Sequence, residues 1–286
     1  MIHIIIPVHN RLNFTKDCLN SLKQQKNYSQ FNLIVVDDGS SDGTRDFLKK
    51  NFPEVKLLRG NGSLYWGGSI NLGIKFVLKM CKDQDWVLIV NNDIEFDFNT
   101  ISVLIDISKK KDRKVLTSAL TLNARDKQTI IKSGTIVESW LLNKTNHIFK
   151  GLNISQINNK NPVQVDLLTG RCLLHPIEIF KIVGNYDSKN FLHYGGDDEF
   201  SMRVKKYGFQ TLVCPNSIVF LKTLNQENKK KISLQSLFFT FFNIKSSSNI
   251  ISKLYFTIKV VPFYAKLSFF IIGILKSFYV FFKNKP

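Results

Sequence analysis

The stretch WVLIVNND (residues 86–93) holds the two features on which the fold depends. Five apolar residues in succession are typical of a strand that is buried on both faces, as in a parallel sheet covered by helices. The two amides and the carboxylate that follow, at residues 91–93, are unusual in a protein interior. They either cap the next turn or belong to a ligand site at the end of the strand.

Apolar strand-like runs alternate with amphipathic helical segments through the first 120 residues. The expected strands are 2–8, 31–39, 55–60 and 86–90, and the expected helices are 11–25, 41–52 and 69–81. This alternation predicts an α/β fold with a mostly parallel sheet flanked by helices. Weaker apolar runs between residues 114 and 164 predict antiparallel additions and loops, and further helices are expected at 176–184 and 195–208.

Three of the expected strands end in polar residues, in the segments IPVHN (6–10), VVDDGSSDGT (35–44) and LIVNND (88–93). The carboxyl ends of parallel strands meet at one edge of a sheet, and ligands bind in the crevice beyond that edge. One polar strand end is readily explained as a helix cap, whereas three that converge indicate a site. The sequence therefore predicts a ligand crevice bordered by these segments.

Acidic side chains in these segments fit the binding of a nucleotide and a cation. The carboxylate of Asp38 could accept a hydrogen bond from the ring N–H of a base, although an Asx-type turn would also explain it. Asp93 suits Mg²⁺ or Mn²⁺, which prefer oxygen ligands, although capping is the alternative. Three acids in succession, residues 197–199, complement a helix N-terminus, and their mutual repulsion raises a pKa as a general base requires.

Together with GSINLGI (68–74), the pair Thr169-Gly170 and YGGDDEFSMRVKKYG (194–208), these segments resemble the family 2 glycosyltransferases in order and spacing. The resemblance covers about residues 1–215. It implies a Rossmann-like GT-A fold, a nucleotide-diphosphate sugar donor, Mg²⁺ or Mn²⁺ as cofactor, and inversion at the anomeric carbon. The implied reaction moves a hexose or a deoxyhexose such as rhamnose onto a hydroxyl of a glycan acceptor in cell-surface polysaccharide biosynthesis. We expect this acceptor to be lipid-linked.

The resemblance gives roles to individual positions. It implies Asp197 as the catalytic base and Asp93 as the direct metal ligand. The donor-binding residues that it implies are Pro7, His9, Asp38, Asn71 and Asn92, and the acceptor-side candidates are Thr169, Gly170, Asp198 and Glu199. Trp66, in the Gly-rich YWGGS (65–69), either stacks on a sugar ring or packs in the core, and we count it with the donor-binding residues.

The sequence departs from the family pattern in two places. The metal motif of the family often begins with an Asp, whereas here Asn91 and Asn92 leave Asp93 as its only carboxylate. Many members also carry a His after the strand that follows the base helix, and Leu221 stands there. A bound cation would therefore depend on the diphosphate of the donor, and we expect its affinity without donor to be weak.

The last quarter of the chain differs from the rest in composition. It supplies ten of the net +18 charges, since residues 222–285 hold eleven Lys and one acid. Its aromatic residues are interleaved with lysines, and one face of a helical wheel carries Lys259, Lys266, Lys276 and Lys283. This pattern favours an interfacial helix on anionic lipid over a membrane-spanning helix, core packing or a site for single-stranded nucleic acid.

The shift in composition also predicts how the chain is divided. We expect a catalytic domain at residues 1–225 and a helical tail for membrane association at residues 226–286, with a polar hinge at 222–231. Four scattered cysteines indicate a reducing compartment, and the N-terminus lacks the charged region of a signal peptide. The sequence therefore predicts a cytoplasmic enzyme that is peripheral on the inner face of the cell membrane.

Other functional classes fit the sequence less well. A nucleotidyltransferase would share the sheet, the nucleotide and the metal, but IPVHNRLNF (6–14) lacks the glycine of a phosphate loop. A dehydrogenase would need G-x-G-x-x-G before a helix. A lipid- or nucleic-acid-binding protein without enzymatic activity would leave the acidic crevice unexplained. We therefore expect an enzyme and no nucleic-acid partner.

Overall fold

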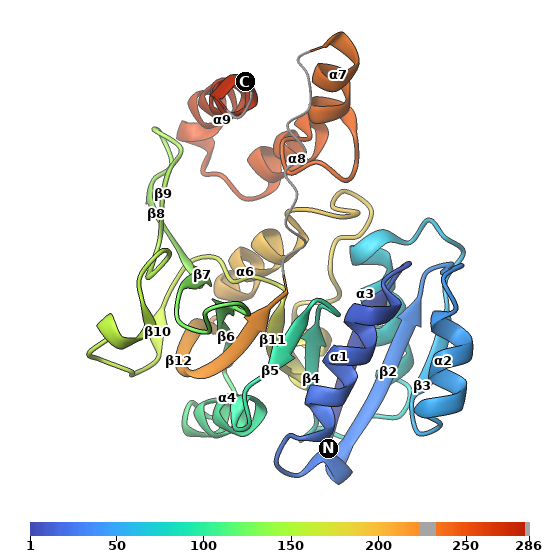
Figure 1. Ribbon diagram of the computed structural model, residues 1–286. Coiled ribbons are helices and arrows are strands. Elements are labelled where there is room, and N and C mark those ends of the chain that lie inside the picture. Colours follow the sequence, from blue (N-terminus) through green and yellow to red (C-terminus); the bar gives the residue numbers. More distant parts are fainter. Residues whose placement is uncertain (223–232, 284–286) are drawn as a thin grey trace.

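The computed structural model describes residues 1–222 and 233–283 (Figure 1). One large sheet carries helices on both faces, and the C-terminal helices lie beyond the sheet. This arrangement confirms the predicted α/β fold with its flanked sheet and helical tail. The hinge predicted at 222–231 and the boundary predicted at 225/226 fall outside the described residues, apart from Lys222.

The N-terminal half of the sheet is parallel, as the sequence predicts. Strand β1 lies between β4 and β2, and β3 forms the edge. The bounds are β1 Ile2–Val8, β2 Phe31–Asp37, β3 Lys56–Arg59 and β4 Trp86–Val90, with helices α1 Leu12–Lys23, α2 Thr44–Asn51 and α3 Tyr65–Val77 between them. In the β1–β2 register, Val8 lies opposite Asp37, so these strands end at the same level.

The other half of the sheet mixes strand directions. Its strands are β5 Ile94–Phe96, β6 Val115–Asn123, β7 Ile130–Lys132, β10 Val163–Gln164, β11 Cys172–Pro176 and β12 Gln210–Leu221. Strand β11 pairs antiparallel with both β4 and β6, and β6 pairs parallel with β12. The antiparallel additions and loops expected at 114–164 describe β6 in part, because it pairs antiparallel with β11 and β7 but parallel with β12. Its residues 115–122 are all buried because it is a central strand.

The two faces of the sheet are covered by different helices. Alternate residues of β1 point to opposite faces, so that Ile5 joins the core beneath α3 while Ile4 and Ile6 join the core beneath α1. The remaining elements of this part are α4 Thr100–Lys110, α5 Ile177–Ile182, α6 Gly196–Lys206 and the hairpin β8 Thr135–Ser139 with β9 Lys144–His147. Helices thus exclude water from both faces of the sheet, which explains why its strands are continuously apolar.

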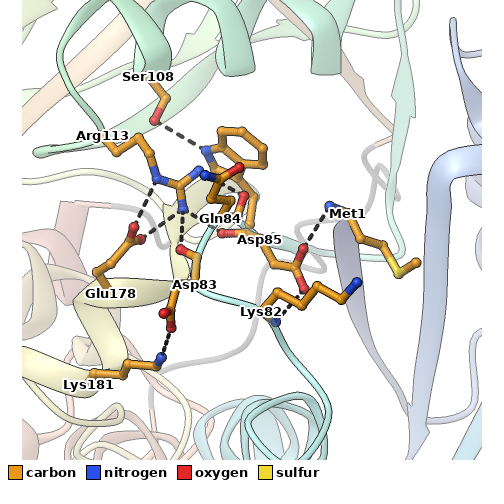
Figure 2. Close-up of polar contacts among 10 residues, drawn as sticks. Met1, Lys82, Asp83, Gln84, Asp85, Ser108, Arg113, Glu178 and Lys181 are labelled. Atoms are coloured by element: carbon orange, nitrogen blue, oxygen red, sulfur yellow. Dashed lines mark hydrogen bonds and ion pairs between the residues drawn. The ribbon is translucent and has the colours of Figure 1, made fainter.

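A polar network fixes the amino end of β4, opposite the polar strand ends (Figure 2). The guanidinium of Arg113 forms a bidentate pair with Glu178 at 3.0 and 2.8 Å and also donates to the carbonyls of residues 83–85. Although burial alone would raise it, hydrogen bonds from the Lys82 N–H, the terminal ammonium and His3 lower the pKa of Asp85 to about 2. The network joins α4, β4 and α5, so its charged residues have a role in holding the fold together.

The C-terminal helices lie beyond the carboxyl ends of the parallel strands (Figure 1). They are α7 Leu234–Phe242, α8 Ile250–Lys259 and α9 Lys266–Lys283. The amide of Asn143, in the turn of the β8–β9 hairpin, donates to the Phe269 carbonyl at 3.0 Å, and Lys259 pairs with Asp187 at 2.5 Å. The tail is therefore docked on the catalytic part.

The helical tail differs from the single lysine face that the sequence predicted. The helix is interrupted around Pro262, so Lys259 lies on α8 while the other three lysines lie on α9. Lys259 pairs with Asp187, Lys266 donates to the Ile258 carbonyl and Lys276 donates to the Asn143 carbonyl, so three of the four lysines bind protein groups. Exposed apolar side chains instead form a stripe at intervals of four residues, namely Phe263, Leu267, Ile271, Leu275 and Tyr279.

This apolar stripe makes the last helix unusual for a protein surface. Leu267 is 75% exposed and Leu275 is 61% exposed. The segment Phe263–Lys283 is long and apolar enough to cross a membrane by length and composition, and 22% of its most apolar window is buried. A large exposed apolar patch of this kind marks an interaction surface.

Candidate active site

The polar ends of β1, β2 and β4 lie together, as the sequence predicts. His9 donates a hydrogen bond from Nδ1 to the Asp38 carbonyl oxygen at 2.6 Å, which joins the ends of β1 and β2. The guanidinium of Arg11 lies 3.2 Å from Asp93, which joins the ends of β1 and β4. Pro7 is half-buried and lies opposite Val36 at the same edge. The three segments that are predicted to border a ligand crevice therefore lie at one edge of the sheet.

Asp38 is buried, and backbone N–H groups hold both of its oxygens. Oδ1 accepts from Gly62 at 2.8 Å, and Oδ2 accepts from Tyr65 at 2.9 Å. The side chain is thus a brace for the loop that precedes α3. Its contact with a nucleotide base stays a prediction, and its position at the strand end is the one expected.

Trp66 lies in the first turn of α3, because the helix begins at Tyr65 rather than at the predicted Ser69. The two glycines that suggested a loop are part of the helix, and a Cβ on Gly67 would lie 2.7 Å from the Phe191 carbonyl oxygen. Glycine is therefore needed for close packing here and not for a turn. The indole Nε1 donates to the Asn91 side-chain oxygen at 2.8 Å.

The ring of Trp66 links the strand ends to the second half of the site. It meets the Tyr186 ring edge-on, with centroids 5.5 Å apart. A Cβ on Gly170 would lie only 2.5 Å from the Trp66 ring, so the Thr169-Gly170 segment passes directly against the indole. Part of the ring is thus committed to packing, and stacking of its remaining surface on a sugar stays a prediction.

The two expected donor-binding asparagines make contacts within the protein. The buried Asn92 amide donates to Thr15 Oγ1 at 2.9 Å, on α1. The Asn71 amide donates to the Tyr186 carbonyl oxygen at 2.7 Å and to Ser188 at 2.9 Å. Their contacts with a donor stay predictions. Asn91, for which the sequence predicted no role of its own within the segment 91–93, is the amide that meets Trp66.

Asp93 has one oxygen available for a cation. Oδ2 accepts from Arg11, whereas Oδ1 is buried and has no hydrogen-bond partner within the described part of the chain. No group of three His, Cys, Asp or Glu side chains that could hold a metal occurs in residues 1–222 and 233–283. The site therefore fits a hard cation that takes one protein carboxylate and completes its shell with donor phosphate and water.

The three acids at the start of α6 have different surroundings. Asp197 accepts from the Gly170 N–H at 2.8 Å and from the Asp198 N–H at 3.1 Å, which fixes its carboxylate against the Thr169-Gly170 segment. Glu199 is buried and forms a bidentate pair with Arg203 at 2.7 and 2.9 Å. Glu199 therefore has a structural partner, and its acceptor-side role stays a prediction, as does that of the half-buried Thr169.

A raised pKa is found in this acidic group at Asp198. Burial and then the charge of Asp197 raise the pKa of Asp198 to about 8, although Lys132 acts in the opposite direction. Burial beside Asp197 therefore favours the protonated form of the Asp198 carboxyl, which could donate a hydrogen bond to a ligand.

The family model for glycosyl transferase family 2 matches residues 3–165, more than half of the chain. The chain belongs to glycosyltransferase family 2. This membership confirms the resemblance that the six segments carried, and it makes the protein a glycosyltransferase. The matched region contains the polar ends of β1, β2 and β4, including Asp93.

Relatives of known sequence agree with this family. The chain is 25% identical over 204 residues to N-acetylglucosaminyl-diphospho-decaprenol L-rhamnosyltransferase of Mycobacterium tuberculosis, and the alignment covers 65% of each chain. It is 30% identical over 115 residues to an uncharacterised glycosyltransferase of Mycoplasma genitalium, covering 38% of this chain and 37% of that one. The chain thus spans just under two thirds of the mycobacterial relative.

Solved glycosyltransferase structures share the fold. GalNAc-T7, solved with UDP, GalNAc and Mn²⁺, has a TM-score of 0.62 at 14% identity, covering 90% of this chain and 50% of that chain. The mannosyltransferase PcManGT of Pyrobaculum calidifontis, solved with GDP-Man and Mn²⁺, has a TM-score of 0.56 at 12% identity, covering 99% and 72%. Identities this low show the GT-A fold alone.

Proposed function

We propose that this glycosyltransferase moves a sugar from a nucleotide-diphosphate donor to a hydroxyl of a lipid-linked glycan, with inversion at the anomeric carbon. The observation that carries the proposal is the chain of contacts from Asn91 through Trp66 and Gly170 to Asp197. It fixes the strand end that bears Asp93 relative to the expected base. An inverting transfer needs these two functions, a base and a cation site, held in one crevice.

Positive side chains on the donor side support a diphosphate ligand. Arg11 lies beside Asp93, and the ammonium of Lys245, from the tail, lies 5.9 Å from the Tyr65 ring centroid. Burial, followed by the charges of Lys245 and Arg11, lowers the pKa of His193, so both cations act on this region. A donor diphosphate placed here would meet Arg11 and Lys245.

The expected cation has a defined place in the proposal. Mg²⁺ or Mn²⁺ bound at Asp93 would offset the charge that develops on the departing nucleoside diphosphate. Two of the solved family-fold neighbours contain Mn²⁺ with UDP or with GDP-Man, which supports a divalent cation here. The chain's own contribution is the free Oδ1 of Asp93 and the Arg11 guanidinium that orients the same carboxylate.

Asp197 is the proposed base on the acceptor side. It would take the proton of the acceptor hydroxyl as that oxygen attacks the anomeric carbon and the bond to the diphosphate breaks. Two backbone N–H groups hold its carboxylate in one orientation, which supports a base with a fixed position. The acceptor class is proposed from the name of the mycobacterial relative, which acts on an N-acetylglucosaminyl diphospholipid.

We place the enzyme on the cytoplasmic face of the cell membrane through its tail. The apolar stripe of α9 would enter the lipid interface, and the excess of lysine would attract anionic headgroups. This position would hold the crevice close to lipid-linked acceptors. A spanning helix is the alternative, which resistance to alkaline carbonate extraction would reveal.

Release of nucleoside diphosphate tests the proposed activity. A panel of nucleotide sugars, with dTDP-, UDP- and GDP-linked hexoses and deoxyhexoses, would be incubated with the full chain and Mn²⁺. We expect hydrolysis of one donor class without acceptor, faster with acceptor, and strongly reduced in Asp93→Ala. If the protein binds and cleaves no nucleotide sugar while remaining folded, the proposed function is wrong.

A further inference from the structure

Two positively charged side chains near the expected base have no hydrogen-bond or ion-pair partner among the residues that the structure describes. Arg171 follows Gly170, whose N–H holds Asp197, and it precedes β11. Lys132 ends β7, which pairs with β6 at Thr121, on the flank of β6 that β11 occupies further along the strand. The backbone carbonyl of Arg171 accepts a hydrogen bond from the Asn91 N–H at 3.0 Å, so Arg171 lies between the end of β4 and the segment that holds Asp197.

Within the described part of the chain, no acidic side chain pairs directly with either cation. The Nε of Arg171 is buried and has no hydrogen-bond partner among the residues that the structure describes. In residues 1–222 and 233–283, neither Arg171 nor Lys132 forms an ion pair. Arg113 and Arg203, which are half-buried as Lys132 and Arg171 are, do form such pairs. Burying a cation without a partner is costly, so an arrangement of this kind points to a bound anion.

The local field has the sign that an anion requires. Burial, followed by the charges of Arg171 and Lys150, lowers the pKa of Lys132, against the opposing effect of Asp198 and Asp197. Burial and then the charges of Lys132 and Lys150 also lower the pKa of His147. The region between β7 and the hairpin is therefore positively charged, and an anion would remove this repulsion.

We propose that Lys132 and Arg171, with Lys150 at the rim, bind the diphosphate that links the acceptor sugar to its lipid. The inference rests on the proposed function, because the site adjoins Asp197, where the acceptor hydroxyl would be deprotonated. Planar guanidinium and mobile ammonium groups are the usual partners of phosphate oxygens. The donor diphosphate, by contrast, is expected at Arg11 and Asp93.

The path of the lipid supports the same orientation. The chain continues from β7 into the β8–β9 hairpin, whose turn contacts α9 through Asn143 and the Phe269 carbonyl. Trp140, in the same turn, packs on the Phe269 ring with centroids 5.6 Å apart. A prenyl chain that leaves a diphosphate at Lys132 and Arg171 could therefore follow the hairpin toward α9.

Direct binding of two matched probes tests this site in the full-length protein. The first is a short-chain prenyl N-acetylglucosaminyl diphosphate, and the second is the neutral prenyl glycoside without phosphate. By calorimetry, we expect the wild type to prefer the diphosphate at least about tenfold, as one charge-assisted contact allows. Lys132→Gln and Arg171→Gln should each remove most of that preference and leave binding of the neutral probe unchanged.

Matched controls separate this site from a general charge effect and from the donor site. Lys144→Gln removes the same charge from an exposed residue of the hairpin and should retain the preference. Asp93→Ala, on the donor side, should also retain it. Equal affinity of the wild type for both probes, or loss of the preference in Asp93→Ala but not in Lys132→Gln and Arg171→Gln, would overturn the proposal.

Other sources of phosphate are distinguished by two further arms. If inorganic pyrophosphate, or vesicles rich in phosphatidylglycerol, bind as tightly as the diphosphate probe and depend equally on Arg171, the assignment to the acceptor is wrong. Thermal unfolding confirms that each variant folds. Donor cleavage in the same preparations tests the proposed function separately. If the protein binds the diphosphate probe but cleaves no donor, the diphosphate site is supported and the proposed transfer reaction is wrong.

Discussion

The indole nitrogen of Trp66 donates a hydrogen bond to the side-chain oxygen of Asn91 at 2.8 Å, and this contact ties α3 to the end of β4. The Trp66 ring then packs against Gly170, whose N–H holds Asp197. Three segments that are far apart in the sequence therefore meet at one aromatic ring. The geometry of the proposed site depends on this contact more than on any single acidic residue.

Trp66→Phe should keep an aromatic ring in place and remove the hydrogen bond to Asn91. We expect the free energy of unfolding to fall by about 1 kcal/mol, which is typical of one lost hydrogen bond. Turnover should fall further than donor affinity, because the strand end and the base lose their alignment. Urea unfolding and steady-state kinetics would measure both. Unchanged turnover in this variant would show that the ring serves only as packing.

Gly170→Ala should be harmful although it adds a single methyl group. The new Cβ would lie 2.5 Å from the Trp66 ring and 3.5 Å from the Asp197 Cβ. Overpacking of this kind typically costs about 1–3 kcal/mol, and it would displace the expected base. Thermal unfolding and product formation are the measurements. If the unfolding temperature and the rate of product formation both stay at wild-type values, the Thr169-Gly170 segment shifts without cost to make room for the methyl group.

The tail should bind lipid through its apolar stripe. Replacing Leu267 and Leu275 by Glu places charges on two strongly exposed positions of α9 and should abolish flotation with anionic vesicles at low and high salt. The matched control is Ile182→Glu, because Ile182 is 54% exposed near the amino end of the sheet. If the double variant floats with the vesicles as well as the wild type does, the apolar stripe does not bind the lipid interface.

Asp198 should make the fold less stable as the pH rises. Its pKa is raised to about 8 in the folded protein, so the folded state binds more protons than the unfolded state between about pH 4 and pH 8. Stability should then fall with rising pH across this window. One proton allows at most about 1.4 kcal/mol per pH unit, and the partial exposure of Asp198 reduces this value.

Asp198→Asn should flatten this pH dependence. Urea unfolding at pH 5 and pH 8 measures it, with Asp106→Asn on the exposed face of α4 as a matched control. The control should show the wild-type decline. A wild-type slope in Asp198→Asn would place the responsible proton on another group.

The sequence predicted the strand ends well because their chemistry is local. Continuous apolar runs that stop at Asp37 and Val90 indicate a parallel sheet, and the order of parallel strands brings their ends together. The start of α3 was missed because Gly67 resembles a loop residue. Only the folded chain shows that it lies against the Phe191 carbonyl.

Side-chain direction was the other feature that the sequence could not supply. Asn91 and Asn92 are adjacent amides, yet one meets Trp66 and the other meets Thr15, because successive residues near a strand end point to opposite faces. Lys132 and Arg171 were missed for a related reason. Lys132 ends the short strand β7 in the region of weak periodicity, whereas Arg171 directly precedes β11, and only the tertiary fold brings them close to Asp197.

Paired measurement of donor affinity and turnover in Asp197→Asn tests the central claim most directly. If Asp197 removes the acceptor proton, the variant should bind the donor nucleotide sugar within about twofold of wild type and lose turnover by about 10²–10⁴-fold. Asp198→Asn replaces the protonated Asp198 carboxyl with an amide that is also uncharged, so this variant should lose much less turnover. Substantial turnover in Asp197→Asn, with the large loss in Asp198→Asn instead, would contradict the assignment and place the base one residue along.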